Sequence, residues 1–387
     1  MRRTVPPIRI LHVIGSLNVG GSQKLMMSLY HAIDRSRIQF DFVIDNDDER
    51  YYQSEIERLG GKVYTLPKLN ALNIFDYLAA WDGFIKDHPE YRVIHGHVRS
   101  TASLYLGIAK KYGRICIAHS HSISNGSGAV AAVKDFLQWP IRYIADYCFA
   151  CSDLAGEWLF GKRACASERY RLFRNPVNVG HFLFDGQARK TIRSSMDISD
   201  DTYVVGNVGR FSDPKNHEFM VKVFYELVKS NPVNSKLLLV GDGELLEPIK
   251  KLVCSLGLSR EVIFTGLIDD PSLHYSAMDA FLAPSKWEGF PISILEAQAS
   301  GLPCLISENI PIDVDIVHSL VRRASISSDP EAWSAYLSDW IHEDNWLEGE
   351  RRVSSGDIKD ILFECNCDVV KVAQEMTTFY EKCFDRD

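Results

Sequence analysis

The feature that most restricts the fold of this chain is an alternation that stops once and then resumes. Apolar runs of strand length alternate with longer amphipathic segments between residues 8 and 152, and again from residue 203 to residue 308. Parallel strands joined by crossover helices produce this pattern, because such strands are buried on both faces. The sequence therefore predicts an α/β protein with two doubly wound, Rossmann-like sheets.

The interruption sets the expected domain boundaries. Residues 171–201 contain a proline, turn residues and charge but no clear strand. We expect a first domain over residues 1–178, a linker over 179–202 and a second domain over 203–367. Ligands of open α/β sheets bind beyond the carboxyl ends of the strands, so the chemistry should lie in strand-to-helix loops. Two such sheets facing each other would form a cleft between the domains.

Composition narrows the class of protein. The 387 residues are 46% hydrophobic and contain no run of 18 apolar residues, so no membrane-spanning helix is expected. The basic and apolar start is short and lacks a small-residue cleavage site, which favours a buried first strand in a cytoplasmic protein. The nine cysteines include a lone CxxC, Cys148 and Cys151, and a lone CxC, Cys365 and Cys367, but no second pair at the spacing of a zinc site. They are expected to be reduced and mostly buried.

The charge is unevenly distributed. The net charge is −8, yet residues 1–200 carry 26 Lys/Arg against 20 Asp/Glu, and residues 99–174 carry 11 against 5. A basic half on an acidic protein suggests an anionic partner, such as a phosphate or lipid headgroups. Nucleic acid is not expected, because no recognised nucleic-acid-binding motif accompanies the charge.

Two loops are candidates for anion binding. Gly20, Gly21 and Ser22 follow the first strand, where glycines let backbone N–H groups approach a ligand; a tight turn is the alternative. Arg210 and Lys215 follow the first strand of the second half. Two cations there suit a diphosphate, although a solvated basic loop would look the same.

The stretch PSKWEGFPISILEAQASGLP, residues 284–303, carries two glutamates, Glu288 and Glu296. A proline at the start and a glycine past the end predict a helix over residues 291–300. Glu288 would precede this helix and Glu296 would lie in its second turn, with backbone N–H groups between them. The arrangement fits a ligand with hydroxyls at both ends and phosphates in the middle, such as a nucleotide-sugar. A helix-dipole partner beside a solvated glutamate is the alternative.

Over essentially its whole length the sequence resembles a retaining GT-B glycosyltransferase of family four, the glycosyl transferases group 1 type. The Glu-x7-Glu stretch with Gly-Phe-Pro is the most specific element of this resemblance. The other matching stretches, in chain order, are GGSQK, IAHSHS, RNPVN, GRFSDPKNH, LLLVGDGE and VIFTGLIDD. The resemblance implies that a terminal helix, about residues 368–387, returns to an N-terminal acceptor-binding domain and that residues 203–367 bind the nucleotide-sugar.

The resemblance also implies roles for individual residues. Arg210 and Lys215 would bind the donor diphosphate, Glu288 the hydroxyls of the donor sugar, and Glu296 those of the ribose. His121, with His119 upstream, would be the active-site histidine. Further donor contacts are expected at Gly20, Gly21, Leu267, Gly289, Phe290, Pro291, Ile292 and Ser293, and acceptor-side contacts at Ser22, Asn125, Gly126 and Ser127.

Transfer from a nucleoside-diphosphate sugar, with a UDP-sugar expected first, would need no cofactor and no metal, because cations and helix N–H groups stabilise the leaving diphosphate. Asp313 and Asp315 form a DxD in sequence only and are interpreted as surface charge. The stretch 129–147 fits either a membrane surface or a packed helix. We expect a hexosyltransferase acting on a lipid-linked saccharide in bacterial exopolysaccharide or capsule synthesis, peripheral on the plasma membrane. A non-catalytic nucleotide-sugar-binding protein and a nucleotide-sugar epimerase are the alternatives.

Overall fold

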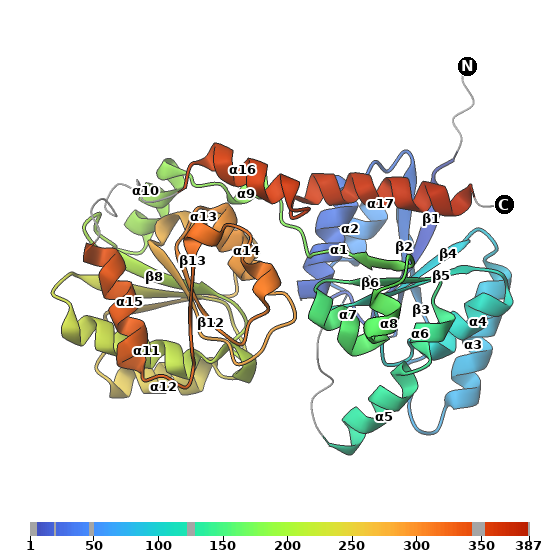
Figure 1. Ribbon diagram of the computed structural model, residues 1–387, viewed down its shortest axis with the longest axis horizontal. Helices are drawn as coiled ribbons and strands as arrows, with labels where there is room; N and C mark the ends of the chain where they lie inside the picture. The colour runs from blue at the N-terminus through green and yellow to red at the C-terminus, as the bar shows by residue number, and fades with distance from the viewer. Residues whose placement is uncertain (1–5, 19–20, 46–49, 122–127, 343–352, 386–387) are drawn as a thin grey trace. The chain divides into compact units, whose positions relative to one another are not determined.

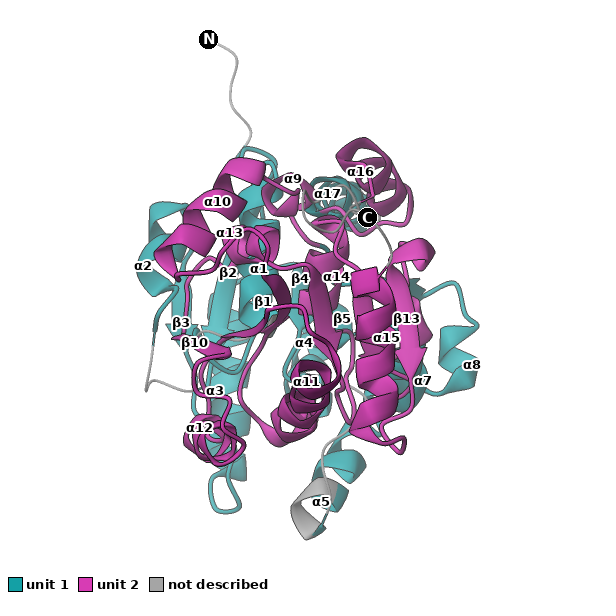
Figure 2. Ribbon diagram, turned by 90° about the vertical axis from the view of Figure 1, so that its left-hand side faces the viewer, with its two compact units in different colours: residues 1–176, 369–387 teal, residues 177–368 magenta. Residues whose placement is uncertain are grey.

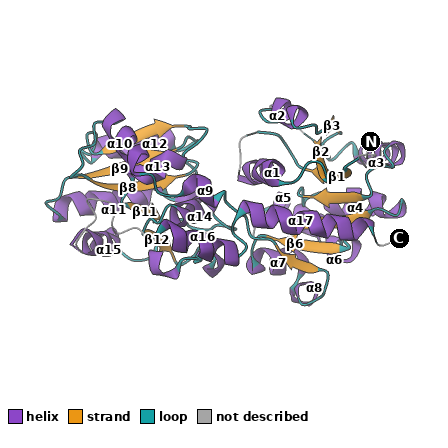
Figure 3. Cartoon of the chain, turned by 90° about the horizontal axis from the view of Figure 1, so that it is seen from above, coloured by secondary structure: helices purple, strands orange, loops and turns teal. Residues whose placement is uncertain are grey.

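The computed structural model divides into two compact units (Figure 2), residues 1–176 with 369–387 and residues 177–368. It describes residues 6–18, 21–45, 50–121, 128–342 and 353–385. Each unit is built around one parallel sheet, with helices on both sides of the strands (Figure 3).

Unit 1 holds a seven-stranded sheet of order β3-β2-β1-β4-β5-β6-β7. Figure 1 labels the strands β1 to β6 of this sheet. Its strands are β1 (Ile8–Val13), β2 (Ile38–Ile44), β3 (Val63–Thr65), β4 (Val93–Gly96), β5 (Ile115–Ser120), β6 (Tyr147–Ala150) and β7 (Tyr170–Leu172). Its helices are α1 (Gly21–Ala32), α2 (Gln53–Arg58), α3 (Ile74–Asp87), α4 (Ala102–Lys111), α5 (Ala129–Gln138), α6 (Ile141–Ile144), α7 (Asp153–Phe160), α8 (Lys162–Cys165) and α17 (Val369–Phe384).

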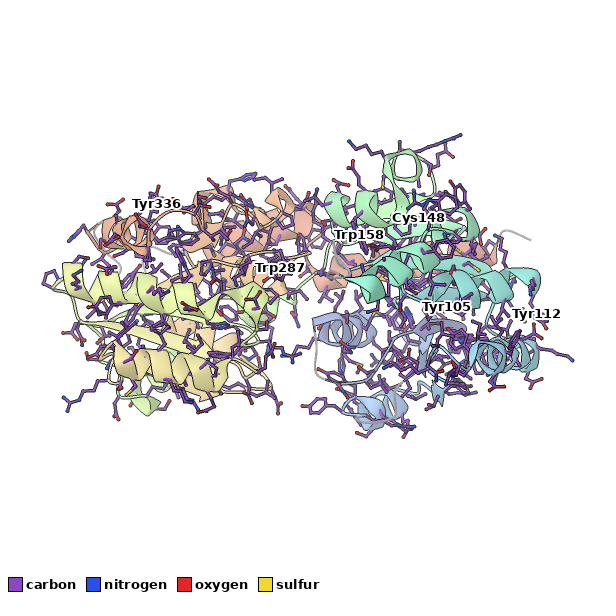
Figure 4. All side chains as sticks on the ribbon, turned by 90° about the horizontal axis from the view of Figure 1, so that it is seen from below. Tyr105, Tyr112, Cys148, Trp158, Trp287 and Tyr336 are labelled. Carbon is purple, nitrogen blue, oxygen red and sulfur yellow. The ribbon has the colours of Figure 1, made fainter. Side chains whose placement is uncertain are left out.

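The two faces of this sheet have different partners, because successive side chains of a strand point to opposite faces. Leu11 and Val13 of β1 join the apolar core that includes α3, α4 and α7. This core contains Tyr105, which is fully buried and stacks on Trp81 (Figure 4). The opposite face carries α17, whose Tyr380 lies against His95 of β4. The terminal helix therefore completes the core of unit 1.

Unit 2 holds a six-stranded sheet of order β10-β9-β8-β11-β12-β13. Its strands are β8 (Tyr203–Val208), β9 (Ser235–Val240), β10 (Val262–Gly266), β11 (Ala280–Ala283), β12 (Cys304–Ser307) and β13 (Val321–Ala324). Its helices are α9 (Val179–Phe182), α10 (Gly186–Ser195), α11 (His217–Ser230), α12 (Leu246–Ser255), α13 (Ser272–Ala277), α14 (Ile292–Ala299), α15 (Pro330–His342) and α16 (Ser355–Glu364), with short 3₁₀ turns η1 (Asp213–Lys215), η2 (Ile312–Val314) and η3 (His318–Leu320).

The structure differs from the sequence analysis at the expected linker, residues 179–202. These residues form α9 and α10, both inside unit 2. Arg189 and Arg193 of α10 each lie 2.6 Å from one carboxylate oxygen of Asp279, and all three side chains are nearly fully buried. A buried carboxylate shared by two guanidinium groups fixes α10 against the start of β11.

Candidate active site

The loop after β8 carries the two predicted cations, and the structure gives them different partners. Arg210 is largely exposed and lies 3.1 Å from a carboxylate oxygen of Glu244. Lys215 ends the 3₁₀ turn η1, and its Nζ lies 2.7 Å from Oε1 of Glu288. The side chains of Lys215 and Glu288 are only 20% and 15% exposed, so this second pair is much better shielded from solvent.

Lys215 and Glu288 meet because β8 and β11 are neighbours in a parallel sheet, which brings their carboxyl-terminal loops to one edge. Two further hydrogen bonds hold the loops together. The backbone N–H of Lys286 donates to the carbonyl of Pro214 at 2.8 Å, and the side-chain amide of Asn216 donates to the carbonyl of Pro284 at 3.0 Å. The position of Glu288 is therefore fixed by backbone contacts as well as by its own side chain.

Glu288 also accepts a hydrogen bond from the Ser285 hydroxyl at 3.0 Å, on the same Oε1 that faces Lys215. Trp287, the residue before it, is about half exposed in this loop (Figure 4). One carboxylate oxygen thus carries both polar contacts. A carboxylate beside a lysine at a sheet edge can accept hydrogen bonds from ligand hydroxyls while the ammonium group attracts an anion.

The helix after this loop is α14, and it begins one residue later than predicted, at Ile292, with the extended Pro291 before it. It ends before Gly301, whose φ of +72° is a left-handed conformation that glycine adopts without strain. Because a helix leaves its first N–H groups without intrahelical acceptors, the backbone at Ile292 and Ser293 offers donors to an anion. Phe290, just before it, is buried.

Glu296 lies in the second turn of α14, as predicted, and a tyrosine that the sequence analysis did not identify holds it. The hydroxyl of Tyr275, from α13, donates to Oε2 of Glu296 at 2.6 Å. Tyr275 is fully buried, and this burial, with the nearby Glu296 charge, raises the pKa of its phenol well above the ordinary value. The phenol therefore stays protonated and acts as a donor. No motif marks Tyr275 in the sequence.

The carboxyl ends of β1, β4 and β5 in unit 1 gather five histidines, of which the sequence analysis singled out only His119 and His121. Nδ1 of His12 lies 3.0 Å from Nε2 of His97, and Nδ1 of His97 lies 2.8 Å from Nε2 of His121. Nε2 of His95 lies 3.2 Å from Nδ1 of His119. Two H-x-H triplets, 95–97 and 119–121, were the signal in the sequence, because side chains two residues apart share one face of a strand.

Burial controls the protonation of these histidines. It lowers the pKa of His121 to about 4 and that of His12 to about 3, and it moves the pKa of His95, His97 and His119 well below the ordinary value. All five imidazoles are therefore neutral near pH 7. A neutral imidazole offers one N–H donor and one lone pair.

The other predicted contact residues fall into two groups, those outside the described residues and those that the structure describes. Gly20, Asn125, Gly126 and Ser127 lie outside the described residues. Gly21 begins α1, and the hydroxyl of Ser22 donates to the side-chain oxygen of Gln23 at 2.9 Å. The remaining two predicted donor contacts follow strands: Leu267 comes directly after β10 and is 62% exposed, and Gly289 belongs to the loop before α14.

The DxD at Asp313 and Asp315 is not simply surface charge, which corrects the interpretation from sequence. Asp315 is nearly buried and forms a two-bond ion pair with Arg323, with N–O distances of 2.7 and 2.8 Å. Arg323 also donates to the carbonyls of Ile310 and Pro311. This aspartate therefore holds the loop between β12 and β13 in place.

The segment 129–147 forms α5 and α6, followed by the first residue of β6, and exposes apolar side chains. Phe136 is 80% exposed, Tyr143 68% and Trp139 54%. The guanidinium of Arg142 lies 5.7 Å from the centre of the Trp139 ring. We call the surface formed by Phe136, Trp139, Arg142 and Tyr143 the α5–α6 surface. Among the described residues, no helix is long and apolar enough to cross a bilayer.

Comparisons with known proteins agree with this fold. The model of the family Glycosyl transferases group 1 matches residues 188–356. The putative glycosyltransferase EpsF of Bacillus subtilis is 33% identical over 338 residues, 85% of this chain and 87% of that protein. An Escherichia coli UDP-Gal:alpha-D-GlcNAc-diphosphoundecaprenol alpha-1,3-galactosyltransferase is 27% identical over 230 residues, 56% of this chain and 58% of that protein.

Solved structures extend the likeness to the whole chain. Anabaena HepE in complex with UDP superposes with a TM-score of 0.78 at 17% identity, covering 97% of this chain and all of that one. A glycosyltransferase from Rickettsia africae gives a TM-score of 0.81 at 14% identity, covering 98% of this chain and all of that one. The predicted α/β fold of the GT-B type, with two parallel sheets, is confirmed.

Proposed function

Because the chain belongs to the glycosyl transferases group 1 family and is a glycosyltransferase, we propose that it transfers a hexose from a UDP-sugar to a lipid-linked saccharide, with retention of the anomeric configuration. The observation that carries the proposal is the arrangement in unit 2. Lys215 and Glu288 form a shielded pair beside the start of α14, and Tyr275 holds Glu296 in the second turn of the same helix.

Each of these groups has a role suited to its chemistry. Lys215 and the N–H groups at the start of α14 bind the diphosphate, and the exposed Arg210 turns from Glu244 to join them. Glu288 accepts hydrogen bonds from hydroxyls of the donor sugar. Glu296, which Tyr275 holds in the second turn of α14, accepts hydrogen bonds from the ribose hydroxyls. Hydrogen bonds to a charged acceptor are about twice as strong as neutral ones, which suits recognition of sugar hydroxyls.

During transfer the bond between the anomeric carbon and the diphosphate breaks, and negative charge develops on the diphosphate. The ammonium of Lys215, the guanidinium of Arg210 and the helix N–H groups stabilise that charge from fixed positions. We therefore propose that the donor site works without a metal ion. His121, with His119 behind it, contributes from unit 1 as the histidine of the acceptor side.

The acceptor is proposed from the relatives and from unit 1. EpsF is named as a glycosyltransferase, and the E. coli relative is named for a diphosphoundecaprenol-linked acceptor. Aromatic side chains beside basic groups favour the interface of an anionic membrane. The α5–α6 surface has that character, which supports a peripheral position on the inner face of the plasma membrane, where a lipid-linked intermediate of surface polysaccharide would be met.

The first test is thermal stabilisation by a panel of UDP-, GDP-, ADP- and dTDP-sugars, with and without EDTA. A ligand at about 100 times its Kd adds about 2.7 kcal/mol of native-state stability. We expect a shift with UDP-sugars that survives EDTA and is lost in Lys215→Met and Glu296→Gln. Glu247→Gln, at an exposed ion pair of α12, should bind the donor as wild type does.

Two results would count against the proposal. If a folded protein responds to no nucleotide-sugar, the site in unit 2 has lost donor binding. If it binds a UDP-sugar but transfers nothing to any prenyl-diphosphate-linked saccharide, a nucleotide-sugar-binding role or an epimerase reaction must be tested instead. Epimerisation would appear as a changed free sugar nucleotide in the absence of acceptor. Retention is tested separately, by NMR of the anomeric configuration of the product.

A further inference from the structure

The five histidines of unit 1 lie in two stacked layers. In the first layer His12, His97 and His121 are joined edge to edge by hydrogen bonds of 3.0 and 2.8 Å. In the second layer His95 and His119 are joined by a bond of 3.2 Å, and the Tyr380 hydroxyl lies 2.7 Å from Nδ1 of His95. The layers stack with ring centres 4.4 Å apart for His95 and His97 and 4.0 Å for His119 and His121.

In the second layer, one ring nitrogen of His119 has no hydrogen-bond partner among the described residues. His119 is only 5% exposed, its Nδ1 is engaged by His95, and its Nε2 is buried with no hydrogen-bond partner among the described residues. A buried polar atom without a partner destabilises the folded state. A protein keeps such an atom more readily when a bound species supplies the missing partner.

We propose that His97, His119 and His121 form a binding site for one transition-metal cation of the kind that prefers imidazole ligands, with Zn²⁺ as the reference ion. The site is separate from the proposed donor groups, which lie in unit 2, but it shares His119 and His121 with the proposed acceptor side. One nitrogen from each of the three imidazoles lies within 4.8 Å of the other two.

Binding such an ion requires two adjustments of the present geometry. Zn–N bonds of about 2.0–2.1 Å at a tetrahedral centre separate two ligand nitrogens by about 3.3 Å. The His97–His121 separation of 2.8 Å therefore needs to open by about half an ångström, and the His119 ring must turn from its stack on His121. All three imidazoles are neutral because burial lowers their pKa, so each has a lone pair to offer.

The surrounding groups support two of the three ligands. Ligand histidines usually donate their second ring N–H to a fixed acceptor, which sets the tautomer. Nδ1 of His12 can be this acceptor for the Nε2–H group of His97. Nε2 of His95 can be the acceptor for the Nδ1–H group of His119. Nδ1 of His95 is in turn fixed by the Tyr380 hydroxyl.

Two of the three ligands, His97 and His121, are partly exposed. His12, His95 and His97 form a second possible group, but two of its three members are fully buried. The more open group is therefore the better choice. Occupancy would withdraw the lone pairs of His119 and His121 from any other use, so the metal should inhibit an activity that depends on them.

The test is a titration of the EDTA-treated and desalted full chain with ZnCl2 against a chromophoric chelator, together with the visible spectrum of the protein with Co²⁺. We expect one equivalent of Zn²⁺ and a Co²⁺ spectrum typical of imidazole ligation. His97→Gln and His121→Gln should each weaken Zn²⁺ binding by about 100-fold or more, because each removes one of three ligands.

The controls are His31→Gln and His88→Gln, which alter histidines beside Glu55 and Glu90 in the same unit. Uptake of less than one equivalent by wild type, or binding that the two ligand variants leave unchanged, overturns the proposal. If a variant fails to fold, the Co²⁺ spectrum of the wild-type protein decides. Stabilisation by UDP-sugar in folded variants separates loss of this site from failure of the donor site.

Discussion

At the scale of single residues, Glu296 depends on a partner that lies outside its own helix. Tyr275→Phe removes one hydroxyl and leaves the aromatic ring in place. We expect the Kd for UDP to rise about 3- to 10-fold, because a hydrogen bond to a charged group is worth about 1.5–3 kcal/mol and the freed carboxylate regains some solvation. Isothermal titration of UDP measures the change.

The control for this prediction is Tyr336→Phe in α15, on the other side of the unit 2 sheet, where UDP affinity should not change. Equal losses in both variants would mean that tyrosine hydroxyls support the unit in general. An unchanged Kd in Tyr275→Phe would show that Glu296 keeps its orientation without the phenol, or that it does not contact the nucleotide.

The second prediction for a single residue is that His217 makes the stability of the protein depend on pH. It starts α11, stacks on Phe211 with ring centres 4.1 Å apart, and has its pKa lowered to about 4, mainly by burial and then by the charge of Lys215. The folded state therefore binds fewer protons than the unfolded state between about pH 4 and 6.5. Stability should fall as the pH drops through this window, by about 2 kcal/mol for this residue between pH 7.5 and 5.0.

His217→Phe keeps the stacking and removes the titrating group, so its free energy of unfolding should depend less on pH by that amount. The difference in pH dependence is measured by urea unfolding at several pH values, with hydrogen exchange of peptides from unit 2 as the probe of unfolding. His318→Phe, at an exposed position of the same unit, is the control. Identical pH curves for wild type and His217→Phe would refute the prediction.

At the scale of elements, α10 is held to the sheet by two arginines that share one carboxylate and also donate to backbone carbonyls. Asp279→Asn leaves Arg189 and Arg193 as buried cations without their counter-ion. Removing one partner of a buried ion pair costs about 3–5 kcal/mol, so unit 2 should lose stability by roughly that amount. Asp339→Asn, which alters an exposed pair with Arg322, should cost less than about 1 kcal/mol. Urea unfolding compares the two, and equal effects would contradict the buried role.

Most strands could be predicted from the sequence, but the position of α10 could not. The strands of the two sheets followed from apolar runs, except β7 and β13, which are three and four residues long and contain exposed or charged positions. Residues 179–202 looked like a linker because α9 and α10 are short and polar. The contact that fixes α10 in unit 2 is with Asp279, 90 and 86 residues beyond its two arginines, and no local pattern records such a contact.

Some residues of the candidate site could likewise be predicted from the sequence, and others could not. Four residues of the site could be named because they lie in strand-to-helix loops, or in the helix that follows one, at recognisable spacing: Arg210, Lys215, Glu288 and Glu296. Tyr275 could not, because its role arises only where α13 packs against α14. The layered histidines required the strand register, in which His12 of β1 faces His95 of β4.

At the scale of the whole molecule, charge separates the two units. Unit 1 carries 26 basic against 21 acidic residues, and unit 2 carries 17 against 30. An anionic lipid surface should therefore attract unit 1 and repel unit 2. The exposed aromatics of the α5–α6 surface lie in the unit with the favourable sign.

We therefore expect the protein to co-sediment with vesicles containing phosphatidylglycerol, and much less with neutral vesicles or at high salt. The double variant Phe136→Ser, Trp139→Ser should weaken binding to anionic vesicles about 10-fold or more, because two aromatic side chains lose their apolar environment. Leu273→Ser and Ile312→Ser alter exposed apolar residues of unit 2 and should have no effect. If all variants bind alike, charge alone accounts for binding and the α5–α6 surface faces another partner.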